Sequence, residues 1–110
     1  MKEKRKLSGR LRVAVAGAGR ITPHHLLAWK GVKSADVVAI ADPLIKRASE
    51  RAAEFDIPGV YEDVSGMLAG EDLNILDIVS PNEFHAEHVR LAAGNNIDAL
   101  CQKPLNKLII

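Results

Sequence analysis

The stretch most informative about the fold of this 110-residue chain is Leu11-Arg12-Val13-Ala14-Val15-Ala16-Gly17-Ala18-Gly19-Arg20-Ile21-Thr22. An apolar run that ends in Gly-x-Gly is typical of a buried strand that turns sharply into a helix, whose N-terminus can receive a phosphate. Gly17 allows the tight turn, and Gly19 lets the backbone approach a pyrophosphate. Thr22 replaces the third small residue of the usual G-x-G-x-x-G/A pattern and is bulkier where helix and strand pack closely. The pattern predicts a dinucleotide-binding turn, and a tight turn of structural role alone is the alternative.

A second apolar run ends at Asp42, about 20 residues after the glycines, as the dinucleotide pattern requires. An acid at this point hydrogen-bonds the ribose hydroxyls of a bound dinucleotide. Because a carboxylate repels a 2′-phosphate, Asp42 favours NAD over NADP, while Arg20 and Arg47 keep NADP possible. Asp42 also precedes Pro43, so capping of the next helix is an alternative role, and one carboxylate can serve both.

Short strands and helices alternate along the rest of the chain. Hydrophobic spacing and turn residues predict strands at 11–16, 37–41, 57–61, 74–80 and 97–101, and helices at 20–30, 44–56, 63–69 and 83–93. We expect Gly31 and Gly94 to cap two of these helices, Gly31 in the left-handed conformation, and Leu26, Leu27 and Trp29 to face the core. The alternation specifies an α/β fold, a Rossmann-type doubly wound parallel sheet with strand order 3-2-1-4-5 and a ligand crevice beside strands one and four.

The composition favours a single globular domain with an aliphatic core. Hydrophobic residues make up 47% of the chain, and only four residues are aromatic, as strands buried on both faces of a parallel sheet require. The single cysteine, Cys101, excludes an intrachain disulfide and fits a reducing compartment. No apolar stretch approaches the ~20 residues of a membrane span. We therefore expect a cytoplasmic protein that does not bind membranes.

Positive charge is concentrated at the start of the chain. Residues 1–12 hold six Lys and Arg against one Glu, whereas the remaining residues carry a net charge of −4. A basic arm can contact nucleic acid through phosphates, but no aromatic residues or repeated pattern accompany this one. We expect residues 1–10 to be a flexible solvated arm without a nucleic-acid partner, and residues 11–110 to be the dinucleotide-binding domain.

Four motifs together resemble the N-terminal half of the Gfo/Idh/MocA oxidoreductases, a family that includes glucose-fructose oxidoreductase and inositol dehydrogenase. The matching pieces are Gly17–Ile21 followed by His25, Ala41-Asp42, Ser80-Pro81-Asn82 followed by His85, and Gln102-Lys103-Pro104-Leu105. The resemblance implies that the glycine turn holds the pyrophosphate and that the turn after strand four lies along the cofactor. The cofactor-binding residues that it implies are Gly17, Gly19, Arg20, Ile21, Asp42, Ser80, Pro81, Asn82, His85, Gln102 and Lys103.

The resemblance gives Lys103 the main chemical role. In the family, the lysine of a Glu-Lys-Pro motif lies by the nicotinamide ribose and the substrate, where it can orient or polarise the reacting hydroxyl and join a proton relay. An exposed lysine at a strand end is the alternative. Gln102 stands where the family usually has Glu, which removes one stabiliser of the lysine's charge. For His85 we expect packing or a cofactor contact, and we expect no metal site because no cysteine-supported histidine cluster is present.

The resemblance implies an NAD(P)-binding domain of an oxidoreductase that transfers a hydride between nicotinamide and a sugar, polyol or related hydroxy compound. Family members continue into a second domain that closes over the substrate, so we expect 110 residues alone to be truncated after strand five and a poor catalyst. A catalytically silent nucleotide-binding or interaction module is the alternative. The apolar end Leu108-Ile109-Ile110 makes a homo-oligomer possible. A methyltransferase is disfavoured, because Val15-Ala16 occupy the places where that class has an acid.

Overall fold

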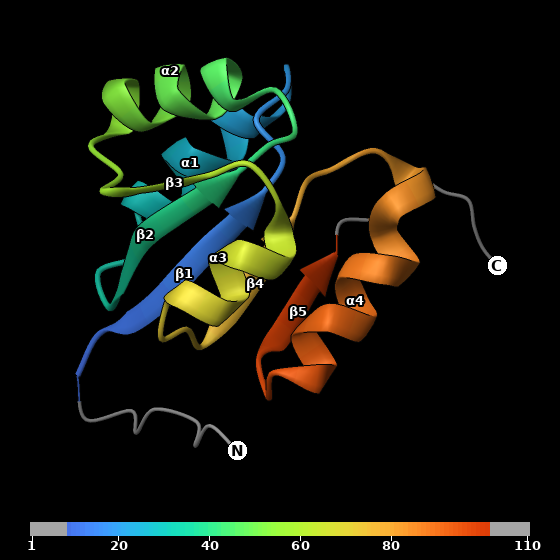
Figure 1. Ribbon diagram of the computed structural model, residues 1–110. Coiled ribbons are helices and arrows are strands. Elements are labelled where there is room, and N and C mark those ends of the chain that lie inside the picture. The colour runs from blue at the N-terminus through green and yellow to red at the C-terminus, as the bar shows by residue number, and fades with distance from the viewer. Residues whose placement is uncertain (1–8, 102–110) are drawn as a thin grey trace, which may run out of the picture.

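A five-stranded parallel sheet with helices on both faces forms the computed structural model, which describes residues 9–101 (Figure 1). The sheet order is β3-β2-β1-β4-β5, and every neighbouring pair is parallel, which confirms the predicted Rossmann-type topology. The strands are β1 (Leu11–Ala16), β2 (Ala35–Ala41), β3 (Gly59–Tyr61), β4 (Ile75–Ile78) and β5 (Asp98–Cys101). The helices are α1 (Thr22–Lys30), α2 (Ile45–Phe55), α3 (Val64–Gly70) and α4 (His85–Gly94), with a 3₁₀ turn η1 (Asn82–Phe84) before α4.

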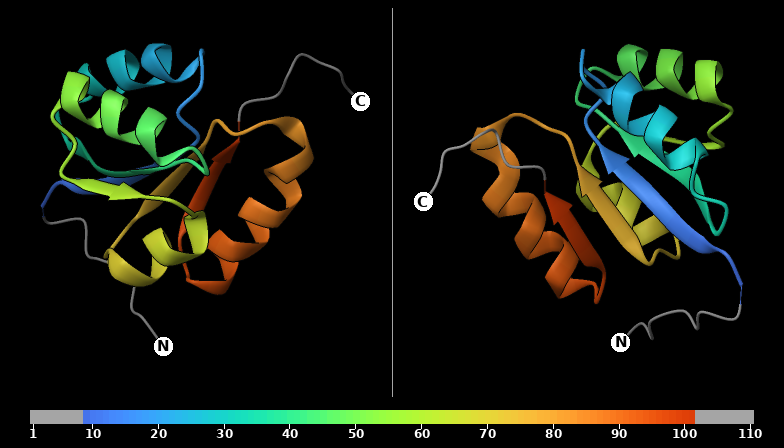
Figure 2. Two further views of the ribbon diagram at one scale, coloured as in Figure 1. Left: turned by 45° about the horizontal axis from the view of Figure 1, so that its top comes forward. Right: turned by 180° about the vertical axis from the view of Figure 1, so that it is seen from behind.

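The helices cover the two faces of the sheet in pairs. Helices α1 and α2 lie on one face, and α3 and α4 lie on the other (Figure 1, Figure 2). Side chains of β1 alternate between the two cores: Val15 packs with Leu26 on the first face, whereas Ala14 and Ala16 pack with Met67 on the second. This explains the continuous apolar run of β1, because a strand covered on both faces has no solvent side.

Several details of the helices differ from the prediction. Leu26 is buried, but Leu27 is 59% exposed, because adjacent helical positions point about 100° apart and only one of the two can face the core. Trp29 is half-buried. Gly31 ends α1 with a φ of −81°, so it does not adopt the left-handed conformation. Helix α4 runs through Gly94, and the left-handed residue lies further on, at Asn96 with a φ of 60°. Asn adopts this conformation more readily than other side-chain-bearing residues do, so glycine is not required there.

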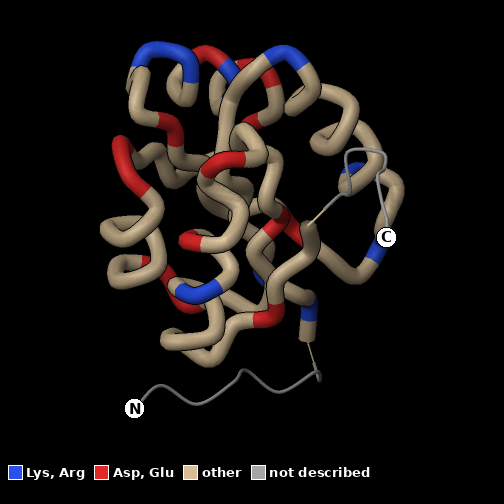
Figure 3. Tube along the Cα trace, turned by 90° about the vertical axis from the view of Figure 1, so that its right-hand side faces the viewer, with Lys and Arg blue, Asp and Glu red and all other residues tan. Residues whose placement is uncertain are grey.

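Positions of both charge signs occur along the described part of the chain. Figure 3 shows Lys and Arg positions among Asp and Glu positions on the Cα trace. None of the helices within residues 9–101 combines the length and apolar character needed to cross a membrane.

Candidate cofactor site

The turn after β1 requires glycine at its first position. Gly17 has a φ of 112°, and its amide donates a hydrogen bond to the Ala41 carbonyl at 2.7 Å. A Cβ atom at this position would lie 2.9 Å from the backbone nitrogen of Ser80. Gly17 therefore combines a backbone conformation that L side chains rarely adopt with a close approach of two strand ends. This agrees with the tight turn predicted at this residue.

Three backbone amides at the start of α1 point to an anion site. Within residues 9–101, the amides of Gly19, Arg20 and Ile21 have no hydrogen-bond acceptor. No side chain caps the helix at Ile21, and Pro23 in the first turn has no N–H to satisfy. Unpaired amides and the positive end of the helix dipole attract a phosphate group. The turn is therefore suited to a pyrophosphate without any charged side chain.

Thr22, which is bulkier than the glycine or alanine usual at this position, is accommodated where α1 packs closely against the sheet. Its side chain is fully buried, and Oγ1 donates a hydrogen bond to the Gly17 carbonyl at 2.9 Å. The hydroxyl thus closes the glycine turn from inside. A glycine or alanine in its place would leave that bond unmade.

Asp42 connects the glycine turn to the start of α2. The residue is 7% exposed, and its carboxylate accepts one bond from the Ala18 amide at 3.0 Å and one from the Leu44 amide at 2.9 Å. The N-cap residue of α2 is Leu44, so Asp42 lies two residues before the cap and accepts the hydrogen bond of the Leu44 amide. Arg47 Nε lies 3.8 Å from Oδ2. Because a carboxylate can accept about four hydrogen bonds, Asp42 retains acceptor capacity for a ligand hydroxyl.

A cavity of about 760 Å³ opens at the carboxyl ends of the strands. This volume is in the range of small-molecule and cofactor sites. Four of the predicted cofactor residues line it, and Gly19, Arg20 and Ile21 form the adjoining turn. The predicted residues along the cavity are Gly17, Asp42, Ser80 and Pro81. Residues that sequence reasoning did not assign to the cofactor, among them Leu44, Phe84 and His88, complete the lining.

Two histidines of α4 hold the turn that follows β4. His85 Nε2 donates to the Ser80 carbonyl at 2.7 Å, and His88 Nδ1 lies 2.8 Å from Ser80 Oγ. Burial lowers the pKa of His88; Glu87 opposes this effect and His85 adds to it. The two histidines are spaced i,i+3 on α4, so they share one face of the helix, and this face contacts Ser80. Asn82 is exposed at the start of η1.

Asp77 is a buried carboxylate that no motif indicated. It lies within β4, is 1% exposed, and its Oδ2 accepts a bond from Trp29 Nε1 at 2.8 Å. His25 Nδ1 lies 2.9 Å from the same oxygen. Asp77 therefore ties α1 to β4 on the face that α1 covers. The pattern of polar and apolar residues along β4 could not predict these hydrogen bonds, because the partners of Asp77 lie about 50 residues earlier in the chain.

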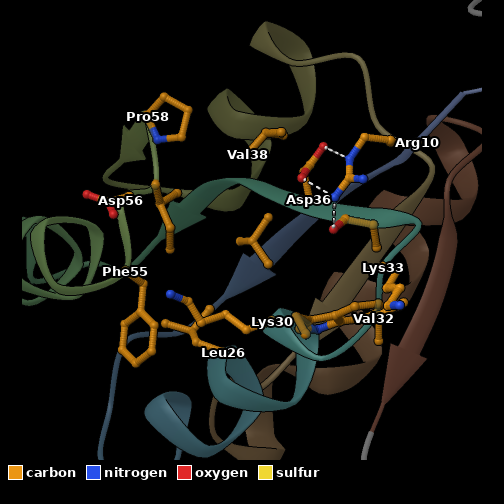
Figure 4. Close-up of a pocket in the computed structure, with 14 residues that line it drawn as sticks. Arg10, Leu26, Lys30, Val32, Lys33, Asp36, Val38, Phe55, Asp56 and Pro58 are labelled. Atoms are coloured by element: carbon orange, nitrogen blue, oxygen red, sulfur yellow. Dashed lines mark hydrogen bonds and ion pairs between the residues drawn. The ribbon is translucent and has the colours of Figure 1, made fainter.

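A second cavity, of about 470 Å³, lies at the opposite ends of the strands (Figure 4). Arg10 there binds Asp36 through bonds of 2.7 and 2.8 Å, and the hydrogen bond from Arg10 is the main reason that the pKa of Asp36 is lowered. Arg10 and Asp36 thus form an ion pair with each other at the edge of this cavity. In open parallel sheets ligands bind outside the carboxyl ends of the strands, so the 760 Å³ cavity is the better candidate.

Gln102 and Lys103 lie outside the described residues, as do Pro104 and Leu105. Within the described part of the chain, no three His, Cys, Asp or Glu side chains are grouped as metal ligands.

Comparison with known proteins gives consistent matches over this region. Residues 11–108 match the family model described as "Oxidoreductase family, NAD-binding Rossmann fold". The chain is 35% identical over 95 residues to a D-apiose dehydrogenase from Paraburkholderia graminis, a match that covers 86% of this chain and 25% of the relative. It is also 35% identical over 100 residues to an inositol 2-dehydrogenase from Streptomyces avermitilis, covering 90% of this chain and 29% of that protein.

A solved structure shows the same architecture with a nicotinamide cofactor. The crystal structure of an oxidoreductase from Agrobacterium radiobacter, in complex with NAD⁺, L-tartaric acid and magnesium, aligns with a TM-score of 0.83 and 33% identity. The alignment covers 89% of this chain and 29% of that one. The chain thus spans between a quarter and a third of the length of these relatives.

Proposed function

The chain belongs to the Gfo/Idh/MocA oxidoreductase family, as an NAD-binding Rossmann-fold domain, and from this we propose that it serves a dehydrogenase acting on a sugar, polyol or related hydroxy compound. The observation that carries the proposal is the set of amides at Gly19, Arg20 and Ile21 that have no acceptor within residues 9–101, beside the cavity that Asp42 lines. When bound, NAD supplies the hydride acceptor. A cytoplasmic location, a domain at 11–110 and self-association belong to the same proposal. The predicted flexible arm at 1–10 lies outside the described residues except for Gly9 and Arg10, and Arg10 is held by Asp36.

Residues that follow β1, β2 and β4 contact different parts of the bound cofactor. The amides of the glycine turn bind the pyrophosphate, and Asp42 accepts a bond from the adenosine ribose. The Ser80-Pro81-Asn82 turn lies along the cofactor, and His85 holds that turn through the Ser80 carbonyl. We propose that the nicotinamide half lies towards β5. We assign contacts with it to Gln102 and Lys103, which lie outside the described residues, with Lys103 as the catalytic residue that orients or polarises the substrate hydroxyl.

Calorimetric titration with NAD and with AMP tests the binding part of the proposal. We expect both to bind, and amide resonances of the glycine turn to shift in NMR spectra, because the adenosine half has its site within one domain. If millimolar NAD, NADH and AMP produce neither heat nor shifts at Gly17 and Gly19, the nucleotide-binding proposal is wrong.

Production of NADH with a panel of polyols and sugars tests the chemical part. The assay uses a chimera that joins this chain to the C-terminal part of the Streptomyces avermitilis relative, since water exclusion and substrate positioning need a covering domain. In that chimera, Lys103→Ala is expected to lower kcat/KM by about 10²-fold with NAD affinity nearly unchanged. Unaltered turnover would make Lys103 an ordinary surface lysine. If the chimera binds NAD but reduces none of it, a silent binding module becomes the better description.

A further inference from the structure

Two large apolar side chains line the 760 Å³ cavity without being buried. Leu44 is 57% exposed and Phe84 is 40% exposed. They belong to the segments that follow β2 and β4, since Leu44 precedes α2 and Phe84 ends η1. Because β2 and β4 pair with opposite sides of β1, these segments lie on either side of the glycine turn. Ligand cavities are lined mainly by apolar and aromatic side chains, so this pair indicates that an apolar part of a ligand binds here.

The Phe84 ring is part of an aromatic pair. It stacks with the ring of His88, one helical turn further on, with centroids 6.1 Å apart and an angle of 21° between the planes. The turn after β4 holds His88 in place, because Nδ1 lies 2.8 Å from the hydroxyl oxygen of Ser80, which is 8% exposed. Both rings line the cavity. A flat aromatic surface of fixed orientation is suited to stacking with a nucleotide base.

The charged side chains along this cavity favour a neutral base over a further phosphate. Besides Asp42, the described lining holds the carboxylates of Glu62, Asp63 and Glu87 and one guanidinium, that of Arg47. Like charges repel, so a phosphate is disfavoured among these carboxylates. An amino group on a neutral base can instead donate a hydrogen bond to a carboxylate.

His88 adds a hydrogen-bonding group to this part of the cavity. Its Nδ1 contacts Ser80, whereas its Nε2 has no hydrogen-bond partner within residues 9–101. Burial lowers the pKa of His88, an effect that Glu87 opposes and His85 increases, so the ring is uncharged at neutral pH. A neutral imidazole nitrogen can form a hydrogen bond with a ring nitrogen or an amino group of a base.

We propose that Phe84 and His88 bind the adenine ring of the cofactor, with Leu44 on the opposite side, and that stacking on Phe84 distinguishes an aromatic base from a bare sugar phosphate. This rests on the proposed function, in which the pyrophosphate and the adenosine ribose have partners and the base has none. The base follows the ribose into the same cavity, because Asp42, Leu44 and Phe84 line it together. Neither Phe84 nor His88 belongs to the motifs that resemble the family.

Calorimetric titration of the 110-residue chain with AMP and with ribose 5-phosphate tests the proposal. The two probes share the ribose and the phosphate, and only AMP carries the base. We expect AMP to bind at least about 10-fold more tightly. Phe84→Ala should weaken AMP binding by about 5-fold or more, as for loss of one stacked aromatic ring, and should leave ribose 5-phosphate binding within about 2-fold. Phe84→Tyr keeps the ring and should bind AMP like the parent.

Leu27→Ala is the matched control for Phe84→Ala. Leu27 is an apolar residue of α1 that is 59% exposed and does not line this cavity, so this variant should bind AMP like the parent. Circular dichroism checks that each variant folds. Equal AMP affinities of Phe84→Ala and Leu27→Ala would overturn the proposal.

His88→Ala and His24→Ala form the corresponding pair for the histidine. His24 is an exposed histidine of α1, so its variant should bind AMP like the parent, whereas His88→Ala should bind AMP more weakly. Equal AMP affinities of these two variants would remove His88 from the proposal.

NMR spectra of AMP bound to the parent give a measurement that needs no variant. The adenine H2 and H8 resonances should shift upfield, because they lie in the ring current of Phe84, and unshifted resonances in bound AMP would overturn the proposal. If the parent binds neither AMP nor NAD, the proposed function fails as well. If AMP binds but its affinity does not depend on Phe84, the proposed function stands and the assignment of the adenine ring is wrong.

Discussion

Replacing Gly17 with alanine tests the geometry on which the cofactor site depends. A side chain at a φ of 112° adopts a sparsely populated conformation, which costs about 1–3 kcal/mol. The new Cβ would also lie 2.9 Å from Ser80 N and 3.0 Å from the carbonyl carbon of Val79. These are backbone atoms of the turn after β4 and cannot rotate away, so overpacking adds about 1–3 kcal/mol. We therefore expect Gly17→Ala to lower the free energy of unfolding by about 4 kcal/mol.

Gly19→Ala is the matched control in the same turn. Among the described glycines only Gly17 has a positive φ, and a Cβ at Gly19 would meet a single side-chain atom, Nη2 of Arg47 at 2.9 Å. An arginine tip can move, so we expect this variant to lie within about 1 kcal/mol of the parent. Urea unfolding followed by circular dichroism measures both variants. With an m value of about 1.5–2 kcal/mol/M, Gly17→Ala moves the midpoint down by about 2 M. Midpoints of the two variants within about 0.3 M of each other would refute the argument from backbone crowding.

Three further predictions concern the polar groups around the sheet. Asp42→Ala is expected to weaken NAD binding by about 1–3 kcal/mol and to reduce the ratio of the affinity for NAD to that for NADP, both measured by calorimetry. If the variant loses stability while this affinity ratio stays unchanged, Asp42 only stabilises the fold through its hydrogen bonds to the Ala18 and Leu44 amides. Trp29→Phe removes one of the two donors to the buried carboxylate of Asp77 and is expected to cost about 1–3 kcal/mol in urea unfolding, whereas no loss would show that this bond contributes nothing net. Burial lowers the pKa of His88, so as the pH falls this histidine takes up a proton in the unfolded chain before it does so in the folded chain, and the free energy of unfolding decreases below pH about 6.5. Between pH 7.5 and 5.5, this decrease should be smaller in His88→Asn than in the parent. An identical pH dependence in the two proteins would show that His88 does not contribute to it.

The order of elements, the sheet topology and the place of the glycine turn could be predicted from the amino-acid sequence. Local signals suffice for these, because an apolar run ending in glycine or a proline after Asp42 acts within a few residues. Parallel strands joined by right-handed helical crossovers then admit few arrangements, and 3-2-1-4-5 is one of them. The residues that line the cavity at Gly17, Asp42, Ser80 and Pro81 followed from the same rule, because the carboxyl ends of parallel strands meet at one edge.

The hydrogen bonds between side chains of different elements could be seen only in the folded chain. Asp42 was predicted as a ribose ligand or a helix cap, and only the folded chain shows that it holds the Ala18 amide of the glycine turn. The bond of Asp77 to Trp29 and the pairing of Cys101 with His85 join residues that are neighbours in space and separated in sequence. No periodicity records such contacts, since a buried polar group is stabilised by whichever partner the packing of helices and strands brings within reach. Sequence thus determined where the chain turns, and packing determined what each polar side chain does there.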